Sequence, residues 1–357
     1  MGDVFTSPSA EQVYRVARQA DAGAGLVLAF GNYAGDRLNF AAARDRLIDE
    51  GIDTRIVYVT DDIASAPAHE RGLRRGIAGT VAVYKIGGAA ADEGRSLDEV
   101  ESVMKRANDR TFSFGVAFAG CTLPGAGEPL FDVDPGRMEF GLGIHGEPGV
   151  SSREWMPADE LASVLVDTVL SERPDDADGR AAVILNGLGG TKYEELFVLH
   201  AHVAPLLRAA GVMPVLTEVG ELVTSLDMAG CSLSITWLDD DLEAMWSAPV
   251  DTAAFRRYAV TEELGVREWI DLPAIAEGSV ASSSDSRRAA RTICECLHVM
   301  ADVAERDAES WGQLDAVAGD GDHGRGMLRG TRAASVAGSA ACDLGGGAGS
   351  VLGSAAA

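Results

Sequence analysis

The spacing of hydrophobic and polar positions predicts an α/β arrangement at the start of the chain. Residues 25–30 form a continuous apolar run of strand length, and residues 55–60 form a second run that is rich in β-branched side chains. A helical pattern over residues 38–50 lies between them, and another helix is expected over residues 9–20. A strand–helix–strand unit of this size is typical of a parallel strand pair covered by helices.

The same alternation of strand and helix patterns continues to residue 250. Further strands are expected over residues 111–119, 138–144, 181–185, 212–219 and 231–238, and further helices over residues 69–91, 96–108, 158–171 and 193–210. A polar stretch at residues 173–179 marks a boundary after which the pattern restarts. We therefore predict an α/β fold with two tandem α/β subdomains, residues 1–173 and 174–250.

The character of the chain changes after residue 250. Periodicity fades over residues 251–284, where Pro, Ala and Ser accumulate, and this predicts a linker. Residues 285–318 and 328–337 then carry helical patterns without a strand signal, so residues 285–357 are expected to begin an all-α domain. The glycine-rich end of the chain, residues 345–357, is typical of a low-complexity linker.

Composition narrows the class of protein. The formal net charge of −25 at pH 7 argues against nucleic-acid binding, which requires clustered Lys and Arg. Five cysteines are present, and the closest two, Cys294 and Cys296, match no zinc-site spacing, so reduced thiols are expected. The N-terminus lacks a signal-peptide pattern and no apolar run is long enough to span a bilayer. We therefore expect a soluble, cytoplasmic protein that binds neither nucleic acid nor membrane.

Residues 138–149 form the stretch around which the rest of the chain is interpreted. An alternating apolar run brings His145 into a turn of Gly, Glu and Pro, with four glycines between positions 141 and 149. Glycine at such positions allows a positive φ or a close approach of backbone and ligand. His145 would then lie at the end of a strand, where open α/β sheets bind their ligands. An ordinary loop histidine is the alternative, and the pattern alone leaves both readings open.

A second candidate site is a carboxylate cluster at the end of the long predicted helix. Asp315, Asp320 and Asp322 lie within eight residues, in a glycine-broken loop that allows them to converge. Carboxylate oxygens suit Mg²⁺ on a nucleotide, whereas a calcium loop is excluded because no Glu occupies its twelfth position. An acidic, capped helix end is the alternative. His323 follows as a metal ligand, a phosphate contact or a supporting donor, and the sequence does not decide between these.

Several stretches together resemble the dihydroxyacetone kinase family in its single-chain, ATP-dependent form. They are residues 5–8 (Phe-Thr-Ser-Pro) with residues 32–36 (Asn-Tyr-Ala-Gly-Asp), residues 141–149 with His145, residues 315–324 with the three aspartates, and the shorter segments 120–124 and 224–228. The resemblance runs in order along nearly the whole chain. It implies a ketose-binding α/β domain followed by a helical-barrel nucleotide domain, as the change of character after residue 250 also suggests.

The resemblance also implies a role for each candidate residue. His145 matches the histidine whose nitrogen adds to the carbonyl carbon of the ketose and holds it as a hemiaminal, which excludes polyols such as glycerol. Asp36 matches the catalytic aspartate that accepts the proton of the attacking hydroxyl. Asp315, Asp320 and Asp322 match the Mg²⁺ ligands, and Asp320, Asp322 and His323 are expected to contact ATP.

The sequence departs from the family pattern in two ways. Gly31 occupies the position where many members carry a substrate-contacting Lys, so a four-carbon ketose such as erythrulose becomes a candidate beside dihydroxyacetone. The family's early segment, with a Ser-Gly-His loop and a second catalytic histidine, is absent, and most of the helical domain is missing. We therefore expect an internal piece of a longer kinase or a truncated gene product, and activity of these 357 residues alone is in question.

Two other functions remain as alternatives. The first is a subunit fed by a phospho-carrier protein instead of ATP, against which stands the linker that joins both domains in one chain. The second is a non-catalytic ketose-binding or regulatory protein. An edge strand or an apolar helix face of an α/β domain can also support a homodimer, for which the sequence gives no direct evidence.

Overall fold

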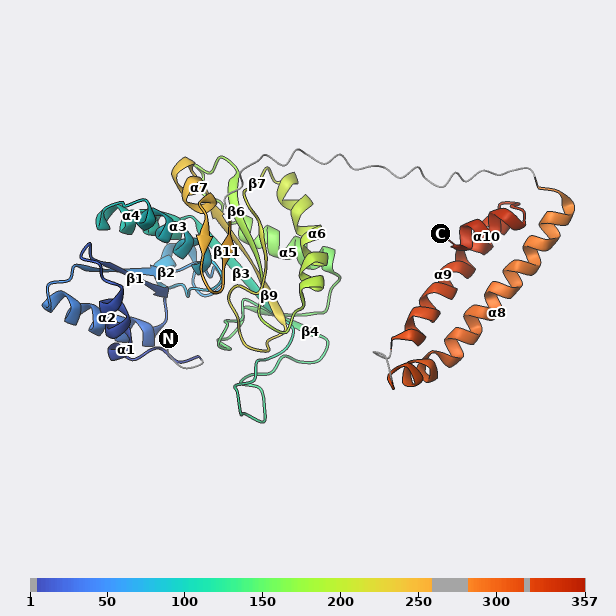
Figure 1. Cartoon of the computed structure of the whole chain (residues 1–357), viewed down its shortest axis with the longest axis horizontal. Helices are drawn as coiled ribbons and strands as arrows, with labels where there is room; N and C mark the ends of the chain where they lie inside the picture. Colours follow the sequence, from blue (N-terminus) through green and yellow to red (C-terminus); the bar gives the residue numbers. More distant parts are fainter. Residues whose placement is uncertain (1–4, 259–281, 318–321, 357) are drawn as a thin grey trace. The chain divides into compact units, whose positions relative to one another are not determined.

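The computed structural model describes residues 5–258, 282–317 and 322–356 (Figure 1). The chain forms two units, residues 1–262 and 263–357. The helices of the first unit are α1 (Ala10–Ala20), α2 (Ala34–Asp49), the 3₁₀ helix η1 (Ala68–Leu73), α3 (Thr80–Asp92), α4 (Leu97–Asp109), α5 (Ala158–Leu170), α6 (Tyr193–Ala209) and α7 (Asp240–Ser247). Its strands are β1 (Leu26–Gly31), β2 (Thr54–Val59), β3 (Thr111–Ala117), β4 (Arg137–Phe140), β5 (Ser151–Glu154), β6 (Arg180–Gly187), β7 (Met213–Pro214), β8 (Glu218–Gly220), β9 (Gly230–Trp237), β10 (Val250–Asp251) and β11 (Arg256–Arg257).

Two sheets organise the first unit. β1 and β2 are parallel, with Leu26 opposite Thr54, as the strand–helix–strand pattern predicted. The larger sheet has seven strands in the order β5-β4-β3-β9-β6-β7, and β8 also pairs with β6. β9 is antiparallel to both β3 and β6, so strands from both sides of residue 173 share one sheet. The mixed α/β class is confirmed, but the expected boundary at 173/174 cuts through a single sheet because β9 returns between β3 and β6.

Helices cover both faces of the larger sheet (Figure 1). α5 and α6 pack on one face through a core that includes Phe114, Leu165 and Leu233. α3, α4 and α7 cover the other face, and their core extends from Ile184 of β6 to Val59 of β2. α3 and α4 therefore link the two sheets, and the loops at the ends of β2 and β4 are held on a rigid scaffold.

Local backbone effects explain where the elements differ from the sequence pattern. The helix expected over residues 69–91 is broken into η1 and α3. Between them the chain passes so close to its neighbours that only glycine fits: a Cβ on Gly76 would lie 2.6 Å from the Gly31 Cα, and one on Gly79 would lie 2.6 Å from the Asp61 Oδ2. The strand expected over 212–219 is divided into β7 and β8, with Leu216 at a φ of +48° between them. The expected linker over 251–284 begins with the short β10–β11 pair, and residues 259–281 lie outside the described residues.

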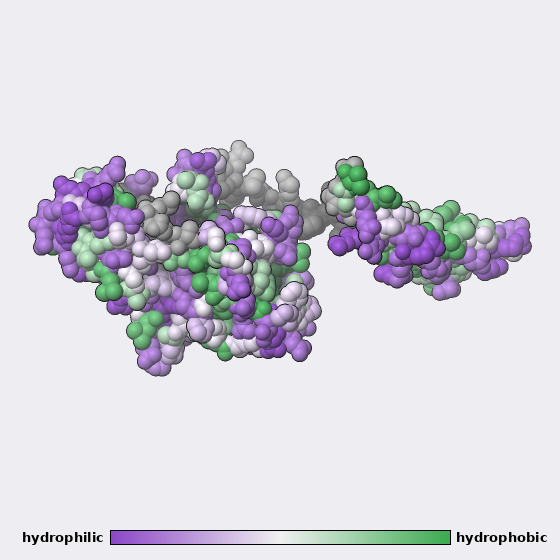
Figure 2. Space-filling model, turned by 90° about the horizontal axis from the view of Figure 1, so that it is seen from below, coloured by the Kyte–Doolittle hydropathy of each residue, from purple (hydrophilic) through white to green (hydrophobic). Residues whose placement is uncertain are grey.

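The described residues of the second unit form helices and no strands, as predicted. It contains α8 (Ser284–Asp315), α9 (His323–Asp343) and α10 (Ala348–Ala356). α10 replaces the low-complexity linker that the glycine-rich end suggested, and Val351 on this helix is fully buried. Large hydrophobic side chains such as Leu314 and Val336 remain exposed, and hydrophobic residues are visible on the surface of this unit in Figure 2. Among the helices of the described residues, none combines the length and apolar character required to cross a membrane.

Candidate functional site

A tight turn after β4 carries His145. β4 ends at Phe140 because Gly141 adopts a φ of +71°, so the strand predicted to run to residue 144 stops four residues early. Within the turn, the Gly143 amide donates to the Glu147 carbonyl oxygen at 3.0 Å, and the Gly146 amide donates to the Gly143 carbonyl oxygen at 3.0 Å. The glycines thus fold the backbone back on itself and project the His145 side chain from the turn.

The His145 ring lies between two aromatic rings and one carboxylate. Phe5 and Tyr33 each meet it edge to face, with ring centroids 4.8 Å apart in both pairs. The His145 Nδ1 lies 3.2 Å from the Glu147 Oε1. No hydrogen-bond partner for Nε2 is present among the described residues, and the side chain is 32% exposed. The ring is therefore fixed on one side and accessible to a small molecule on the other.

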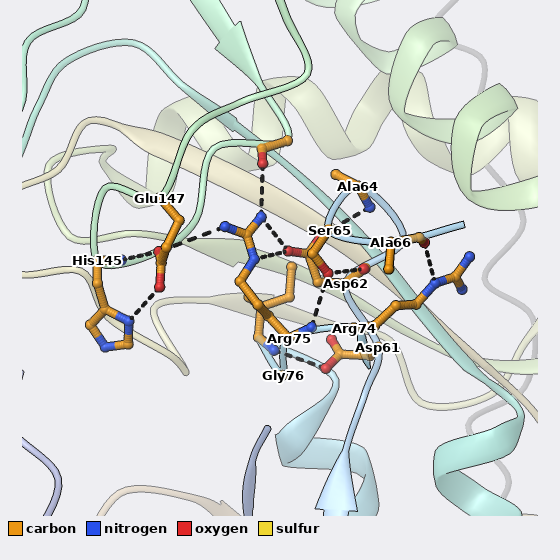
Figure 3. Close-up of polar contacts among 12 residues, drawn as sticks. Asp61, Asp62, Ala64, Ser65, Ala66, Arg74, Arg75, Gly76, His145 and Glu147 are labelled. Atoms are coloured by element: carbon orange, nitrogen blue, oxygen red, sulfur yellow. Dashed lines mark hydrogen bonds and ion pairs between the residues drawn. The ribbon is translucent and has the colours of Figure 1, made fainter. Parts of the chain in front are cut away.

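Glu147 connects His145 to a buried charge network (Figure 3). The Glu147 Oε2 accepts the His145 backbone N–H at 3.1 Å and lies 3.8 Å from the Arg75 Nη1. The Arg75 Nε donates to the Asp62 Oδ2 at 2.8 Å, and its Nη2 donates to the Gly141 carbonyl oxygen at 3.1 Å. Arg75 precedes α3 and Asp62 follows β2, so two loops of the scaffold hold the His145 turn.

Burial and hydrogen bonding set the charges in this network. Burial raises the pKa of Asp62 to about 6, although Arg75 opposes this shift. Burial also acts to raise the pKa of Glu147, but hydrogen bonds from the His145 ring and from backbone amides outweigh it and lower the pKa to about 2. The Tyr33 pKa is raised, mainly by burial and then by the Glu147 charge. At neutral pH, Glu147 is a carboxylate and Tyr33 a neutral phenol that donates to the Gly76 carbonyl oxygen at 3.0 Å.

We expect Asp62→Asn to gain stability relative to the wild type as the pH rises. Folded Asp62 keeps its proton up to about pH 6, whereas in the unfolded chain it is lost near the ordinary value of 3.8. The folded wild type therefore binds the extra proton between these values, and its free energy of unfolding falls there by up to about 3 kcal/mol as the pH rises. Asn does not titrate in this range, so the stability of the variant lacks this dependence on pH. Urea unfolding of both proteins at acidic and neutral pH measures the difference, and a change of opposite sign would mean that the attraction of Arg75 outweighs burial.

Two other segments contact the turn that carries His145. The Ser225 hydroxyl donates to the Ile144 carbonyl oxygen, next to His145. Cys121 and Met228 are fully buried in a cluster against which Ile144 packs. The segments 120–124 and 224–228, far apart in sequence, therefore meet at this cluster.

Asp36 lies on α2, shortly after Tyr33 in sequence, and no hydrogen bond or ion pair joins its side chain to His145 among the described residues. Asp36 lies in the first turn of α2, three residues after Tyr33, and is half-buried. Among the described side chains, none forms a hydrogen bond or ion pair with it. Its charge adds to burial and to Asp61 in raising the pKa of Tyr84. Asp36 thus lies three residues after the Tyr33 whose ring contacts His145, and its carboxylate has no side-chain partner among the described residues.

Gly31 fills a packing role at the end of β1. A Cβ added there would lie 3.0 Å from the Tyr33 Cε2 and 3.1 Å from the Gly76 carbonyl oxygen. The space next to the Gly31 Cα is therefore occupied by the Tyr33 ring, which in turn contacts His145. A longer side chain at this position would have to displace that ring or point away from it.

The carboxylate cluster is only partly described. The His323 backbone N–H donates to the Asp315 Oδ2 at 3.4 Å, and Asp322 occupies the N-cap position of α9. Asp320 lies outside the described residues. Within the described part of the chain, no group of three His, Cys, Asp or Glu side chains is placed to hold a metal. Two of the three predicted carboxylates thus flank the α8–α9 turn, with hard oxygen donors of the type Mg²⁺ prefers.

Sequence reasoning did not assign a role to Glu147, Arg75, Asp62 or Tyr33. Glu147 and Tyr33 stood inside the motifs that were singled out, and Asp62 ends a predicted strand. Arg75 carried no signal, because it lies within a stretch that was expected to be helical. A polar residue directly after a buried strand was the one available indication.

Comparison with known proteins finds matches to one group of sugar kinases. A family model described as the Dak1 domain matches residues 1–254. A protein named D-erythrulose kinase from Mycolicibacterium smegmatis is 51% identical over 99% of this chain, and the match covers 62% of that relative. A dihydroxyacetone-binding subunit of a PTS-dependent dihydroxyacetone kinase from Listeria innocua is 38% identical, over 72% of this chain and 77% of that protein.

A search of solved structures finds the same group of kinases. The dihydroxyacetone kinase of C. freundii, in complex with AMP-PNP and Mg²⁺, is similar to 96% of this chain with a TM-score of 0.65 and 30% identity. The match covers 61% of that enzyme. The chain therefore spans about three fifths of the length of the erythrulose kinase and of the C. freundii enzyme.

Proposed function

This chain belongs to the dihydroxyacetone kinase family, and on that premise we propose that it is the ketose-binding part of an ATP-dependent kinase for short ketoses. The observation that carries the proposal is the setting of His145. Its ring is held between Phe5 and Tyr33, its Nδ1 faces Glu147, and its Nε2 is open to a small molecule. We include a cytoplasmic location in the proposal.

The proposed reaction begins with capture of the ketose. The His145 Nε2 adds to the carbonyl carbon and holds the sugar as a hemiaminal, which requires a ketone and excludes glycerol. Asp36 accepts the proton of the primary hydroxyl that attacks the phosphate. Its position in the first turn of α2, three residues after the Tyr33 that contacts the His145 ring, supports this role. Phosphoryl transfer then depends on positioning and charge neutralisation.

Residue 31 supports erythrulose as a candidate substrate beside dihydroxyacetone. Gly31 carries no side chain that could reach the ketose, and the Tyr33 ring fills the adjacent space. Because residue 31 carries no long cationic side chain, a four-carbon ketose meets none at this position. The D-erythrulose kinase that is 51% identical to this chain supports erythrulose beside dihydroxyacetone.

Carbon-13 NMR of ketoses labelled at the carbonyl carbon tests the proposal. Dihydroxyacetone and erythrulose are each titrated with the protein, because conversion of a ketone to a hemiaminal moves that carbon out of the carbonyl region. Glycerol, which lacks a carbonyl, serves as the matched negative ligand. Loss of the carbonyl signal for at least one ketose supports capture, and the tighter of the two identifies the preferred chain length. If both ketones stay unchanged at high protein concentration, the proposed function is wrong.

We propose that Asp315, Asp320 and Asp322 hold Mg²⁺ on the phosphates of ATP, with His323 as a phosphate contact. When bound, the metal would neutralise phosphate charge. The closeness of Asp315 to the first amide of α9 supports a shared role for the two helix ends. We expect Asp322→Asn to weaken Mg²⁺-dependent binding of AMP-PNP by about tenfold or more. Asp302→Asn, on the exposed side of α8, is the control, and equal affinity in both variants would contradict the assignment.

A carrier-fed subunit is the second candidate. The match to the Listeria innocua subunit favours it, because that protein is a separate dihydroxyacetone-binding chain. The three helices of the second unit favour the single-chain form, since they lie beyond the residues that the Dak1 model matches. Free exchange of ADP supports the ATP-dependent form, whereas ADP that stays bound as a cofactor supports the carrier-fed form.

A further inference from the structure

We propose that Glu147 is a positioning residue that fixes His145 in the tautomer protonated on Nδ1, and that Gly143 and Arg75 hold the Glu147 carboxylate in place for this purpose. The inference deepens the proposed function, since it concerns the nucleophile of ketose capture and rests on that capture.

The tautomer follows from the hydrogen bond. The His145 Nδ1 and the Glu147 Oε1 are 3.2 Å apart, and an ionised carboxylate can only accept a hydrogen bond. The low pKa of Glu147, about 2, keeps it ionised throughout the neutral range. Nδ1 must therefore carry the hydrogen, and in the neutral ring Nε2 carries the lone pair. The nitrogen that faces the open side of the site is thus the nucleophilic one.

The Glu147 carboxylate lies in a closely packed position, called its seat below, formed by Gly143 and Arg75. A Cβ on Gly143 would lie 2.0 Å from the Glu147 Oε2 and 2.6 Å from the Arg75 Nη1, so only glycine leaves room for both groups. Gly143 has no positive φ, so the need for glycine here is steric. Arg75 is itself locked by Asp62 and by the Gly141 carbonyl oxygen. The two charged partners are almost enclosed, with side chains 14% and 3% exposed for Arg75 and Asp62.

This seat also suits the electron flow of capture. The Nε2 lone pair forms a bond to the ketone carbon, and the carbonyl π pair moves to oxygen. The positive charge that develops on the ring is balanced by the Glu147 carboxylate. Water protonates the former carbonyl oxygen, and the Nδ1 proton passes by way of Glu147 to the hydroxide that is left, so water is regenerated, Glu147 ends as a carboxylate, and ketone plus imidazole equals hemiaminal.

Nitrogen-15 NMR of the His145 ring in the free protein tests the tautomer directly. We expect the neutral wild-type ring to be protonated on Nδ1 alone. In Glu147→Gln the amide can either accept or donate, so both tautomers are expected, and ketose affinity should fall by about tenfold or more. Glu154→Gln, on the exposed part of β5, is the matched control and should leave the tautomer and the affinity unchanged.

A second variant moves the carboxylate without removing it. Gly143→Ala is expected to displace Glu147 and to reproduce the mixed tautomers, whereas Gly127→Ala, where an added Cβ meets nothing within 4 Å, should not. If both Glu147→Gln and Gly143→Ala keep the Nδ1–H tautomer, the positioning role is wrong even when ketose is captured. If the wild-type tautomer is as expected but no ketose is captured, the proposed function fails while the tautomer assignment stands.

Discussion

His145→Ala is expected to abolish capture of dihydroxyacetone and erythrulose, with a loss of affinity of about a hundredfold or more. In the proposed mechanism, the covalent bond to the ketone is the interaction that distinguishes a ketose from glycerol. Two nucleophilic side chains of the segments that meet below Ile144, Cys121 and Ser225, are not placed to replace the imidazole. Cys121 is fully buried and burial raises its thiol pKa, while the Ser225 hydroxyl donates to the Ile144 carbonyl oxygen. The carbonyl-labelled ketoses used for the wild type measure the loss.

The control for this prediction is His202→Ala. His202 is exposed on α6, away from the His145 turn in sequence, and its removal should leave capture unchanged. Backbone amide spectra of both variants confirm that the fold is retained. Undiminished conversion of the labelled ketone by His145→Ala would show that another residue performs the addition, and the site would then have to be placed elsewhere.

Local features of this protein could be predicted from its sequence. The apolar run at β1 and the β-branched run at β2 gave a parallel pair because their strand length and intervening helix leave few other arrangements. The glycines around His145 also predicted a special turn, and the structure contains φ values of +71° at Gly141 and +85° at Gly146. These properties depend on neighbours within a few residues, which sequence patterns report well.

Long-range pairings could not be predicted in the same way. β9 is inserted between β3 and β6, and its alternation of Ser and apolar residues fits several possible partners equally well. The Asp62–Arg75–Glu147 network likewise joins the connection between β2 and α3 to the turn after β4, which is far away in the chain. A buried Arg is recognised only when its partners are known, because as a sequence letter it resembles any surface cation. The roles of Glu147 and Arg75 therefore emerged only from the structure.

Arg74 and Arg75, which are adjacent in the connection between β2 and α3, are expected to have different functions. Arg75 faces the His145 turn, whereas Arg74 is directed toward the end of α5. The Arg74 side chain is 1% exposed, its Nε donates to the Ala66 carbonyl oxygen at 2.8 Å, and its Nη2 lies 2.9 Å from the Glu172 Oε1. Arg74 thus ties the connection between β2 and α3 to the helix layer of the larger sheet.

Arg74→Ala is therefore expected to lower the free energy of unfolding by about 3–5 kcal/mol, because it leaves a cavity and removes the partner of Glu172. Arg15→Ala, which breaks a surface pair with Glu11 on a side chain that is 75% exposed, should cost less than about 1 kcal/mol. Urea unfolding followed by the fluorescence of the buried Trp237 and Trp246 measures both.

The same variant also separates stability from positioning. Under conditions where Arg74→Ala remains folded, the His145 ring should keep the Nδ1–H tautomer, since Arg75 retains its bonds to Asp62 and to the Gly141 carbonyl oxygen. Replacing the pair by Arg74→Met with Glu172→Gln should recover part of the lost stability, because neutral side chains of similar volume fill the site. If Arg74→Ala lowers the free energy of unfolding no more than Arg15→Ala does, the buried ion pair does not hold the loop between β2 and α3. The fixed position of Arg75 would then need another cause.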